Sequence, residues 1–236
     1  MKKLNIVFVL TILLSSTITI VKAQDRQFVW SYQSNTLPKG AKDIEAWTTY
    51  RTGREYFYNR LDTRLEFETG LSNKLQTALY FNASHQSFGA SIDTLGGIAD
   101  TSVSGIFSES EFSISSEWKL NIMDASTAPF GFAVYAELGL ATNELEIENK
   151  LIFDKRYEKN MWALNLINEM ELEYEVEKGG EVEKEWEAEP QISLSYMHMF
   201  KTNFGLGVEI ISSNEIEEGE WNFSALSAGP SLKHTR

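Results

Sequence analysis

Charged side chains alternate with apolar ones along residues 60–70, and they are the first candidates for chemistry. Asp62, Arg64, Glu66 and Glu68 lie two positions apart, with leucine, threonine and phenylalanine between them. Positions two apart share one face of a β-strand, whereas a helix would spread them around its axis. Rings of carboxylates attract cations. The run therefore predicts a charged strand face that faces a polar interior.

The same alternation on other segments extends this face into a network. We expect its members to be Arg51, Arg54, Arg60, Asp62, Arg64, Glu66, Glu68, Glu109, Glu111 and Glu137. Further acids with the same pattern are Glu117, Glu169, Glu171, Glu173, Glu187, Glu189 and Glu209. Two interpretations stay open: a binding site or cation-selective pore, or a salt-bridged plug that fills a narrow barrel. In either case the carboxylates outnumber the basic groups.

His85 and Ser87 are the candidates for catalysis. Their spacing resembles the short motif of outer-membrane acyl hydrolases, in which a serine nucleophile and a histidine base share one strand face. We expect that face to be the apolar one, next to Phe81 and Ala83. Acyl transfer also needs an orienting third group and an oxyanion hole. Those enzymes usually carry an asparagine after the serine, where this chain has Phe88. A strand end that enters a loop is the structural alternative.

Metal and cofactor chemistry has little support in the composition. The chain contains no cysteine, and its three histidines are scattered. The acidic segment 181–189 lacks the glycine-punctuated aspartate pattern of a calcium loop and more simply predicts an extended strand. No phosphate loop, dinucleotide fingerprint or HExxH motif occurs. We therefore expect no metal and no cofactor.

The charge balance and the first residues indicate class and location. A formal net charge of -13 argues against a nucleic-acid partner, which requires a basic surface. Lys2 and Lys3 precede an apolar run over residues 4–21, and Ala23 precedes Gln24 at a junction that suits a signal peptidase. We expect residues 1–23 to be a cleaved signal peptide. A transmembrane anchor is the alternative, because the run approaches the ~20 residues needed to span a bilayer.

The period-two pattern continues through the rest of the chain and predicts ten strands. They cover residues 44–51, 60–70, 75–83, 106–120, 130–140, 145–157, 162–176, 186–196, 204–210 and 223–232. Short turns at 71–74, 158–160 and 201–203 alternate with longer polar connections at 52–59, 86–105, 177–184 and 212–220.

Ten long antiparallel strands fit either a soluble barrel or a transmembrane barrel. The two differ in which face is apolar: the inner one in a soluble barrel, the lipid-facing one in a membrane barrel. Strand length, the alternation of short and long connections, and aromatic residues near strand ends favour the membrane barrel. These aromatic residues are Trp47, Tyr50, Tyr80, Trp118, Trp162, Trp186, Phe200 and Trp221. The membrane barrel predicts that Leu65, Phe67, Leu79 and Phe132 face lipid.

The segments 30–40, 44–47, 49–54 and 60–68 resemble a known family. They are similar to small, functionally uncharacterised outer-membrane β-barrel proteins of Bacteroidota-type bacteria. The similarity is close over residues 30–82 and looser at 148–157, 169–189 and 224–230. It implies a signal peptide and an even-stranded barrel, with about 12 strands in full-length members, and no agreed activity. Such barrels normally end on an aromatic residue, whereas this chain ends Leu232-Lys-His-Thr-Arg236. We therefore expect a truncation at the C-terminus.

Together these observations predict an all-β, antiparallel, up-and-down transmembrane β-barrel over residues 43–236. Residues 24–42 would form a periplasmic N-terminal segment. The expected partners are outer-membrane lipid, the barrel assembly machinery and an unidentified small solute. The expected role is non-enzymatic: passive transport or binding of a small polar or cationic solute, or a structural envelope role. The alternatives are a membrane-embedded acyl hydrolase that uses His85 and Ser87, and a soluble periplasmic barrel that binds an apolar ligand.

Overall fold

The computed structural model describes residues 27–53, 57–93, 102–176, 182–217 and 219–234. The expected signal peptide at residues 1–23 lies outside these ranges. Within them the protein consists of strands, turns and an extended N-terminal segment. None of the described residues belongs to a helix with the length and apolar character that crossing a bilayer requires.

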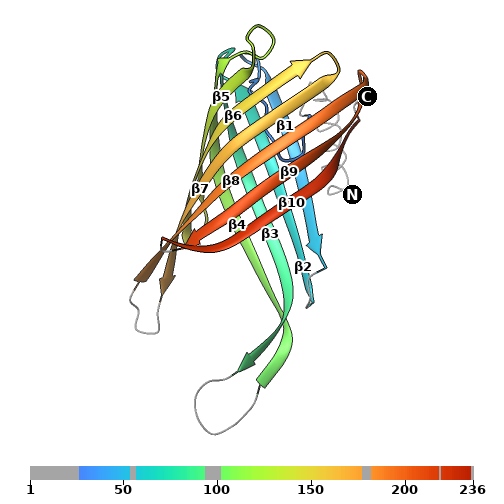
Figure 1. The fold of residues 1–236 in the computed structure, drawn as a ribbon. Helices are drawn as coiled ribbons and strands as arrows, with labels where there is room; N and C mark the ends of the chain where they lie inside the picture. The colour runs from blue at the N-terminus through green and yellow to red at the C-terminus, as the bar shows by residue number, and fades with distance from the viewer. Residues whose placement is uncertain (1–26, 54–56, 94–101, 177–181, 218, 235–236) are drawn as a thin grey trace, which may run out of the picture.

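Ten antiparallel strands follow one another in a single sheet whose spatial order equals the sequence order. They are β1 (Lys42–Thr52), β2 (Tyr58–Gly70), β3 (Leu75–Asp93), β4 (Ser102–Met123), β5 (Gly131–Leu140), β6 (Glu144–Tyr157), β7 (Asn160–Val176), β8 (Val182–Lys201), β9 (Phe204–Glu217) and β10 (Glu220–His234). The sheet curves into a half-barrel, and among the described residues β1 and β10 are not paired with each other (Figure 1). The prediction of an all-β, up-and-down, ten-stranded architecture is confirmed.

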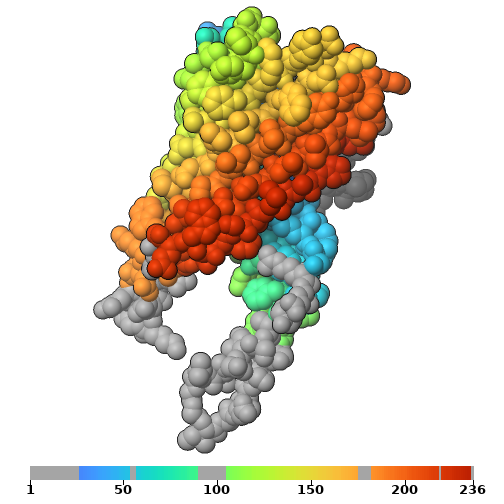
Figure 2. All heavy atoms as spheres, in the orientation of Figure 1, coloured from blue at the N-terminus to red at the C-terminus, as the bar shows by residue number. Residues whose placement is uncertain are grey.

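The concave face of this sheet is polar and its convex face is apolar. Acidic side chains point to the concave face, where Glu66 and Glu117 are almost completely buried. Large apolar side chains point to the convex face, where Leu65, Phe67 and Leu79 are 41%, 40% and 42% exposed. The convex side of β6 to β10 forms one continuous surface (Figure 2). We call the space on the concave side the lumen. A soluble barrel has the opposite arrangement, with apolar side chains inside.

The two ends of the half-barrel differ in their connections. At the short-turn end, uppermost in Figure 1, β2 and β3, β6 and β7, and β8 and β9 are joined by turns of a few residues. The β4–β5 turn lies at the same end. There the carboxylate of Asp124 accepts hydrogen bonds from the N–H (2.8 Å) and the hydroxyl (2.7 Å) of Ser126. These bonds lower the pKa of Asp124.

At the opposite end the strands continue further than expected, which corrects two predicted loops. The predicted loop 86–105 is mostly strand, because β3 runs to Asp93 and β4 begins at Ser102. The predicted loop 212–220 is also mostly strand, because β9 runs to Glu217 and β10 begins at Glu220. Hydrogen bonds between the backbones of two strands do not require an apolar face. A hairpin is therefore able to continue through serine-rich and glutamate-rich sequence in which polar and apolar side chains no longer alternate. The β3–β4 hairpin consequently projects well beyond the other strands (Figure 1).

Pro190 interrupts the sheet in the middle of β8. Proline has no N–H to donate, so it is unusual in a strand that is paired on both sides. The β8–β9 pairing accordingly stops at Ala188 and resumes at Gln191. The side chain of Asn214 restores one link by donating to the carbonyl of Pro190 at 3.2 Å. The sequence-based prediction of a strand through this position is confirmed, with a local gap in the backbone pairing.

The N-terminal segment 27–38 lies inside the lumen, near the short-turn end. It has no strand partner, and buried backbone N–H groups must find acceptors. Inward-pointing side chains supply them: three successive N–H groups, those of residues 29–31, donate to the carboxylate of Glu209 at 2.7, 3.0 and 3.1 Å. The N–H groups of Tyr32, Ser34 and Leu37 donate to Asn165, Asp154 and Gln76.

Apolar contacts complete the docking of this segment. Phe28 packs against Met161, Ala163 and Met197 in one small buried cluster. Tyr32 packs in another with Ala133, Tyr135 and Ile152. Because every strand from β3 to β9 contributes a partner, the segment is held across the lumen and does not lie along one wall. The interior is therefore partly plugged by the chain itself.

Candidate functional site

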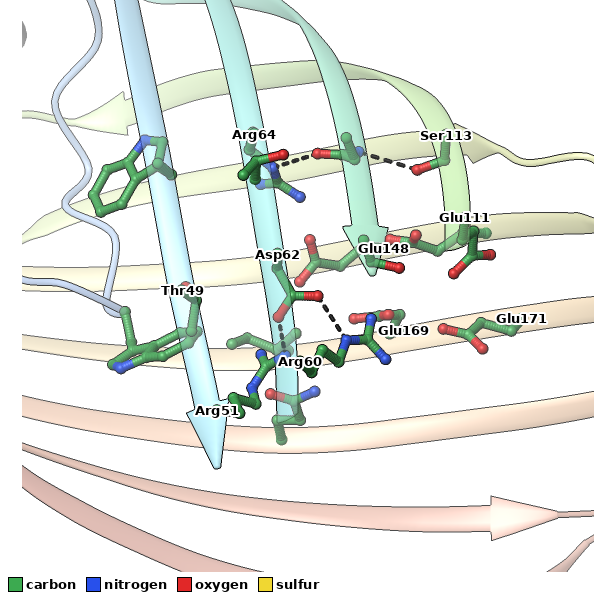
Figure 3. A pocket seen from close by; sticks show the side chains of 18 of the residues that line it. Thr49, Arg51, Arg60, Asp62, Arg64, Glu111, Ser113, Glu148, Glu169 and Glu171 are labelled. Atoms are coloured by element: carbon green, nitrogen blue, oxygen red, sulfur yellow. Dashed lines mark hydrogen bonds and ion pairs between the residues drawn. The ribbon is translucent and has the colours of Figure 1, made fainter. Parts of the chain in front are cut away.

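A cavity of about 610 Å³ lies in the lumen beside the N-terminal segment. The segment contributes Val29, Trp30 and Tyr32 to its lining. Basic side chains from β1 and β2 line one side, and acidic side chains from β4, β6 and β7 line the other (Figure 3). The acidic members, which we call the acidic wall, are Glu111, Glu144, Glu146, Glu148, Glu169 and Glu171.

The basic side chains of the cavity are held in place by partners on their own strands and on β3. Asp62 accepts from Arg60 Nε at 2.6 Å and forms a second, shorter ion pair with Arg51. Arg64 donates from Nε to the side-chain oxygen of Asn82 at 2.7 Å. Its guanidinium also lies over the ring of Tyr80, 4.6 Å from the ring centre. Three arginines thus share one carboxylate, and the cavity lining as a whole carries seven acidic against four basic side chains.

The acidic wall belongs to a larger pattern that the strand register creates. Directly opposite residues on β4, β5, β6, β7 and β8 are glutamates, each paired with the next. This acidic row consists of Glu117, Glu137, Glu148, Glu169 and Glu189. Like charges directly opposite each other destabilise a sheet. Such a row therefore requires compensation from protons, basic groups or bound cations.

Within the acidic wall, carboxylates approach one another closely enough to share a cation. Oxygens of Glu146, Glu148 and Glu169 lie within 4.8 Å of one another, and so do those of Glu144, Glu146 and Glu171. One basic group forms an ion pair with these carboxylates: Lys150 Nζ lies 2.9 Å from Glu148 Oε2. Lys150 is also shared with the N-terminal segment, because its ammonium lies 4.2 Å from the ring centre of Tyr32. The wall retains a surplus of carboxylates.

The predicted charge network is distributed over two regions of the lumen. Arg51, Arg60, Asp62, Arg64 and Glu111 line the cavity. Glu66, Glu68 and Glu137 are buried in the sheet wall outside the cavity lining. Glu109 lies further along β4 and accepts from Gln86 Nε2 at 2.6 Å. Arg54 lies outside the described residues.

The sequence interpretation missed the most important part of the wall. The predicted network does not contain Glu144, Glu146, Glu148 and Lys150. The last three lie in the strand predicted over residues 145–157, and Glu144 is the first residue of the observed β6. Two members of the expected aromatic girdle were also wrong. Trp47 lines the cavity, and Tyr80 is completely buried with its hydroxyl bonded to Glu117. The alternation of polar and apolar side chains shows which side of a strand faces the lumen only when the bounds of that strand are known.

His85 and Ser87 lie on the convex face, as the alternation predicted. Each is hydrogen-bonded to β4: His85 Nδ1 lies 2.8 Å from Ser110 Oγ, and Ser87 Oγ lies 2.9 Å from Ser108 Oγ. Both residues sit within the extended β3 strand and not at a strand end. The hydrolase alternative stays a prediction, and these bonds supply no further support for it.

The acidic segment expected at 181–189 is part of β8 from Val182 onward, which confirms the prediction of a strand there. Glu181 lies outside the described residues. Glu187 and Glu189 point into the lumen, where their oxygens lie within 4.8 Å of those of Glu215 on β9. Histidine is absent from every acidic group found among the described residues, so any ion held there would be coordinated by oxygen.

Comparison with known proteins assigns the chain to a family whose function is unknown. A search of curated proteins found no match. Residues 20–236 match the model of a family described as "Family of unknown function (DUF6662)". Because the match covers the whole N-terminal segment and all ten strands, the chain belongs to this family of unknown function.

Proposed function

We propose that this protein is an outer-membrane β-barrel that binds a small cationic solute in its lumen. The observation that carries the proposal is the polarity of the sheet, which presents apolar side chains outward and lines an acidic cavity of about 610 Å³. The proposed partners are membrane lipid on the convex face and a cation on the acidic wall. The proposed role is binding and not catalysis.

The convex face supports the membrane location. Monomeric soluble proteins rarely expose large contiguous apolar patches. Here exposed leucine, isoleucine, valine and phenylalanine side chains occur on every strand from β1 to β10. Exposed aromatic residues lie near both ends of this band: Trp162 and Phe200 at the short-turn end, and Trp186 and Trp221 at the opposite end. Aromatic girdles of this kind are typical of membrane–water interfaces.

The charge of the cavity supports a cationic ligand. The arginines on the basic side are already paired with Asp62 or stacked on Tyr80, whereas the acidic wall has one direct basic partner, Lys150. A cation placed at Glu146 and Glu169 would relieve the repulsion between neighbouring carboxylates. Because the cavity walls exclude part of the surrounding water, this attraction is stronger than at an open surface.

The N-terminal segment favours binding over free conduction. It crosses the lumen and is fixed there by Glu209, Asn165 and Asp154. Barrels whose lumen is filled by chain do not form open aqueous channels. The segment therefore favours a chamber that holds a solute over an open channel.

Titration of the purified full chain with 1,4-diaminobutane, followed by calorimetry, tests this proposal. We expect binding that weakens as salt is raised. Glu146→Gln together with Glu169→Gln should weaken it at least about tenfold, since each removes one charge from the wall. Glu220→Gln, an exposed acid outside the cavity, is the matched control and should bind as wild type. Equal heat from uncharged 1,4-butanediol, or an unaffected double variant, would contradict the proposal.

A further inference from the structure

Two arginines stand directly opposite each other on the basic side of the cavity. The antiparallel register of β1 and β2 pairs Arg51 with Arg60, and both residues line the cavity. Like charges that face each other across two strands destabilise a sheet. One carboxylate compensates them, because Asp62 accepts from Arg60 Nε at 2.6 Å and forms a shorter ion pair with Arg51. We call Arg51 and Arg60 the arginine pair.

The arginine pair retains hydrogen-bond donors and is accessible to a solute. Each guanidinium carries five N–H donors, and the hydrogen bonds described to Asp62 use one donor of each arginine. The side chains of Arg51 and Arg60 are 46% and 33% exposed, whereas that of Lys150 on the acidic side is 8% exposed. A solute in the cavity is therefore able to reach the arginine pair more easily than the buried lysine.

Two further carboxylates near the arginine pair have partners of their own. Glu109 lies in the same cross-strand row as the pair, and it accepts from Gln86 Nε2 at 2.6 Å. Glu111 attracts Arg60, but its side chain shares a hydrogen bond with Glu144 on the acidic wall. Within the part of the chain that the structure describes, neither carboxylate is bonded to the arginine pair. They reduce its surplus of positive charge without occupying its donors.

Arg64, the third arginine of the lining, is held by the sheet. Its Nε donates to Asn82 at 2.7 Å, and its guanidinium lies over the ring of Tyr80. The next inward position on the same strand is Glu66, which is buried and offsets the charge of Arg64. The two arginines that are able to receive an anionic group are therefore those of the arginine pair.

The cavity lining thus carries opposite charges on its two sides. Strands β1 and β2 contribute three arginines and one aspartate, whereas β4, β6 and β7 contribute the six glutamates of the acidic wall and Lys150 (Figure 3). A solute whose charges all have one sign is attracted by one side and repelled by the other. A solute that carries an ammonium group and a carboxylate complements both sides.

The size and the apolar part of the lining fit an organic solute. A volume of about 610 Å³ lies in the range of sites that enclose small organic molecules. Besides the charged groups, the lining includes the apolar side chains Val29, Trp30, Trp47, Ile167 and Ile211. Methylene groups between an ammonium group and a carboxylate would contact these side chains. A metal ion alone would use neither the apolar lining nor the arginine pair.

We propose that the cavity selects cations that also carry a carboxylate, the class to which basic amino acids belong. The carboxylate accepts hydrogen bonds from Arg51 and Arg60, whose planar guanidinium groups match its geometry. The ammonium groups lie on the acidic wall. This inference rests on the proposed function and specifies its ligand: the acidic wall attracts the positive charge, and the arginine pair distinguishes an acid from its neutral amide.

Calorimetric titration of the purified full chain with L-lysine and L-lysinamide tests this selectivity. The two compounds have nearly the same shape, but the amide lacks the carboxylate and carries the larger positive charge at about pH 6, where the amines are protonated. A site that attracts positive charge alone binds the amide more tightly. We expect lysine to bind at least about tenfold more tightly, because it alone accepts charge-assisted hydrogen bonds from the arginine pair.

Two variants locate the selectivity. Arg51→Gln removes one member of the arginine pair and leaves the ion pair between Arg60 and Asp62 in place. It should reduce the preference for lysine over lysinamide by roughly tenfold. Its affinity for 1,4-diaminobutane should be unchanged or higher, which also shows that the variant is folded. Lys201→Gln removes an exposed charge outside the cavity lining and is the matched control, which should keep the preference.

The outcomes separate this inference from the proposed function. Tighter or equal binding of lysinamide by the wild type, or an unchanged preference in Arg51→Gln, would overturn the inference. Binding of 1,4-diaminobutane without a preference for lysine would do so while the proposed function stands. Binding of lysine in preference to lysinamide, with no binding of 1,4-diaminobutane, would contradict the proposed function and keep the carboxylate selectivity. Absence of binding by all three compounds would overturn both.

Discussion

At the scale of single residues, the lumen uses carboxylates in three different ways. Asp62 joins two arginines, Glu209 accepts three backbone N–H groups, and Glu117 accepts from the side chains of Tyr80 and Gln76. An acidic side chain therefore neutralises charge, holds a segment in place, or links neighbouring strands of the wall. Which of these applies is decided by the neighbouring strands and by the N-terminal segment. A list of acidic residues in the sequence cannot distinguish them.

Replacement of Glu209 tests how the N-terminal segment is held. Glu209→Ala leaves three N–H groups without their acceptor: the N–H of Ser31 is buried, and those of Val29 and Trp30 are partly buried. Loss of the partner of a buried group costs about 1–3 kcal/mol. We expect amide hydrogen exchange over residues 28–37 to accelerate roughly 10- to 100-fold. Glu209→Gln keeps one carbonyl oxygen and should have a smaller effect. Exchange at the wild-type rate in Glu209→Ala would show that the apolar contacts of Phe28 and Tyr32 suffice to hold the segment.

At the scale of strands, side-chain alternation allowed the number and order of the elements to be predicted. Residues 60–83 alternate so regularly that the β2–β3 hairpin follows from the pattern, and the structure confirms it. The extensions of β3, β4 and β9 could not be predicted from this pattern, because apolar residues do not recur at every second position in the serine-rich and glutamate-rich stretches. The acidic row required the register between strands, and a single sequence does not specify that register before the turns are known.

The interior position of the N-terminal segment could not be predicted for a related reason. Its residues were expected to precede the barrel on the periplasmic side. Nothing in residues 27–38 marks them as lumen residues, because their partners are polar side chains that lie 39 to 180 positions further along the chain. The charge network was only partly anticipated. Glu66, Glu68 and Glu111 were identified from alternation in their own strands, whereas Glu146 and Glu148 were missed.

A charge placed on the convex face tests the membrane proposal strand by strand. Leu65→Arg puts a guanidinium within the apolar band of β2, where a cation near the bilayer midplane costs about 2–4 kcal/mol. We expect this variant to fail to assemble in the membrane, as judged by the amount of folded protein on an unboiled gel. Thr52→Arg adds the same charge to the exposed end of β1 and is the matched control. Equal assembly of the two variants would contradict a lipid-facing band at Leu65.

At the scale of the whole molecule, the features combine into one consistent arrangement. The apolar side chains lie on the outside, so the concave face has no large hydrophobic core. Polar side chains and the segment fill that interior instead. The central claim of the account is that the exterior is stabilised by lipid. A membrane supplies the apolar environment that water cannot.

Fractionation of cells that express the full chain, followed by gels of boiled and unboiled samples, tests that claim most directly. The account predicts that the protein occurs in the outer-membrane fraction and migrates differently before and after boiling, because a folded barrel resists detergent until it is heated. Recovery in the soluble periplasmic fraction, with the same mobility in both samples, would contradict it.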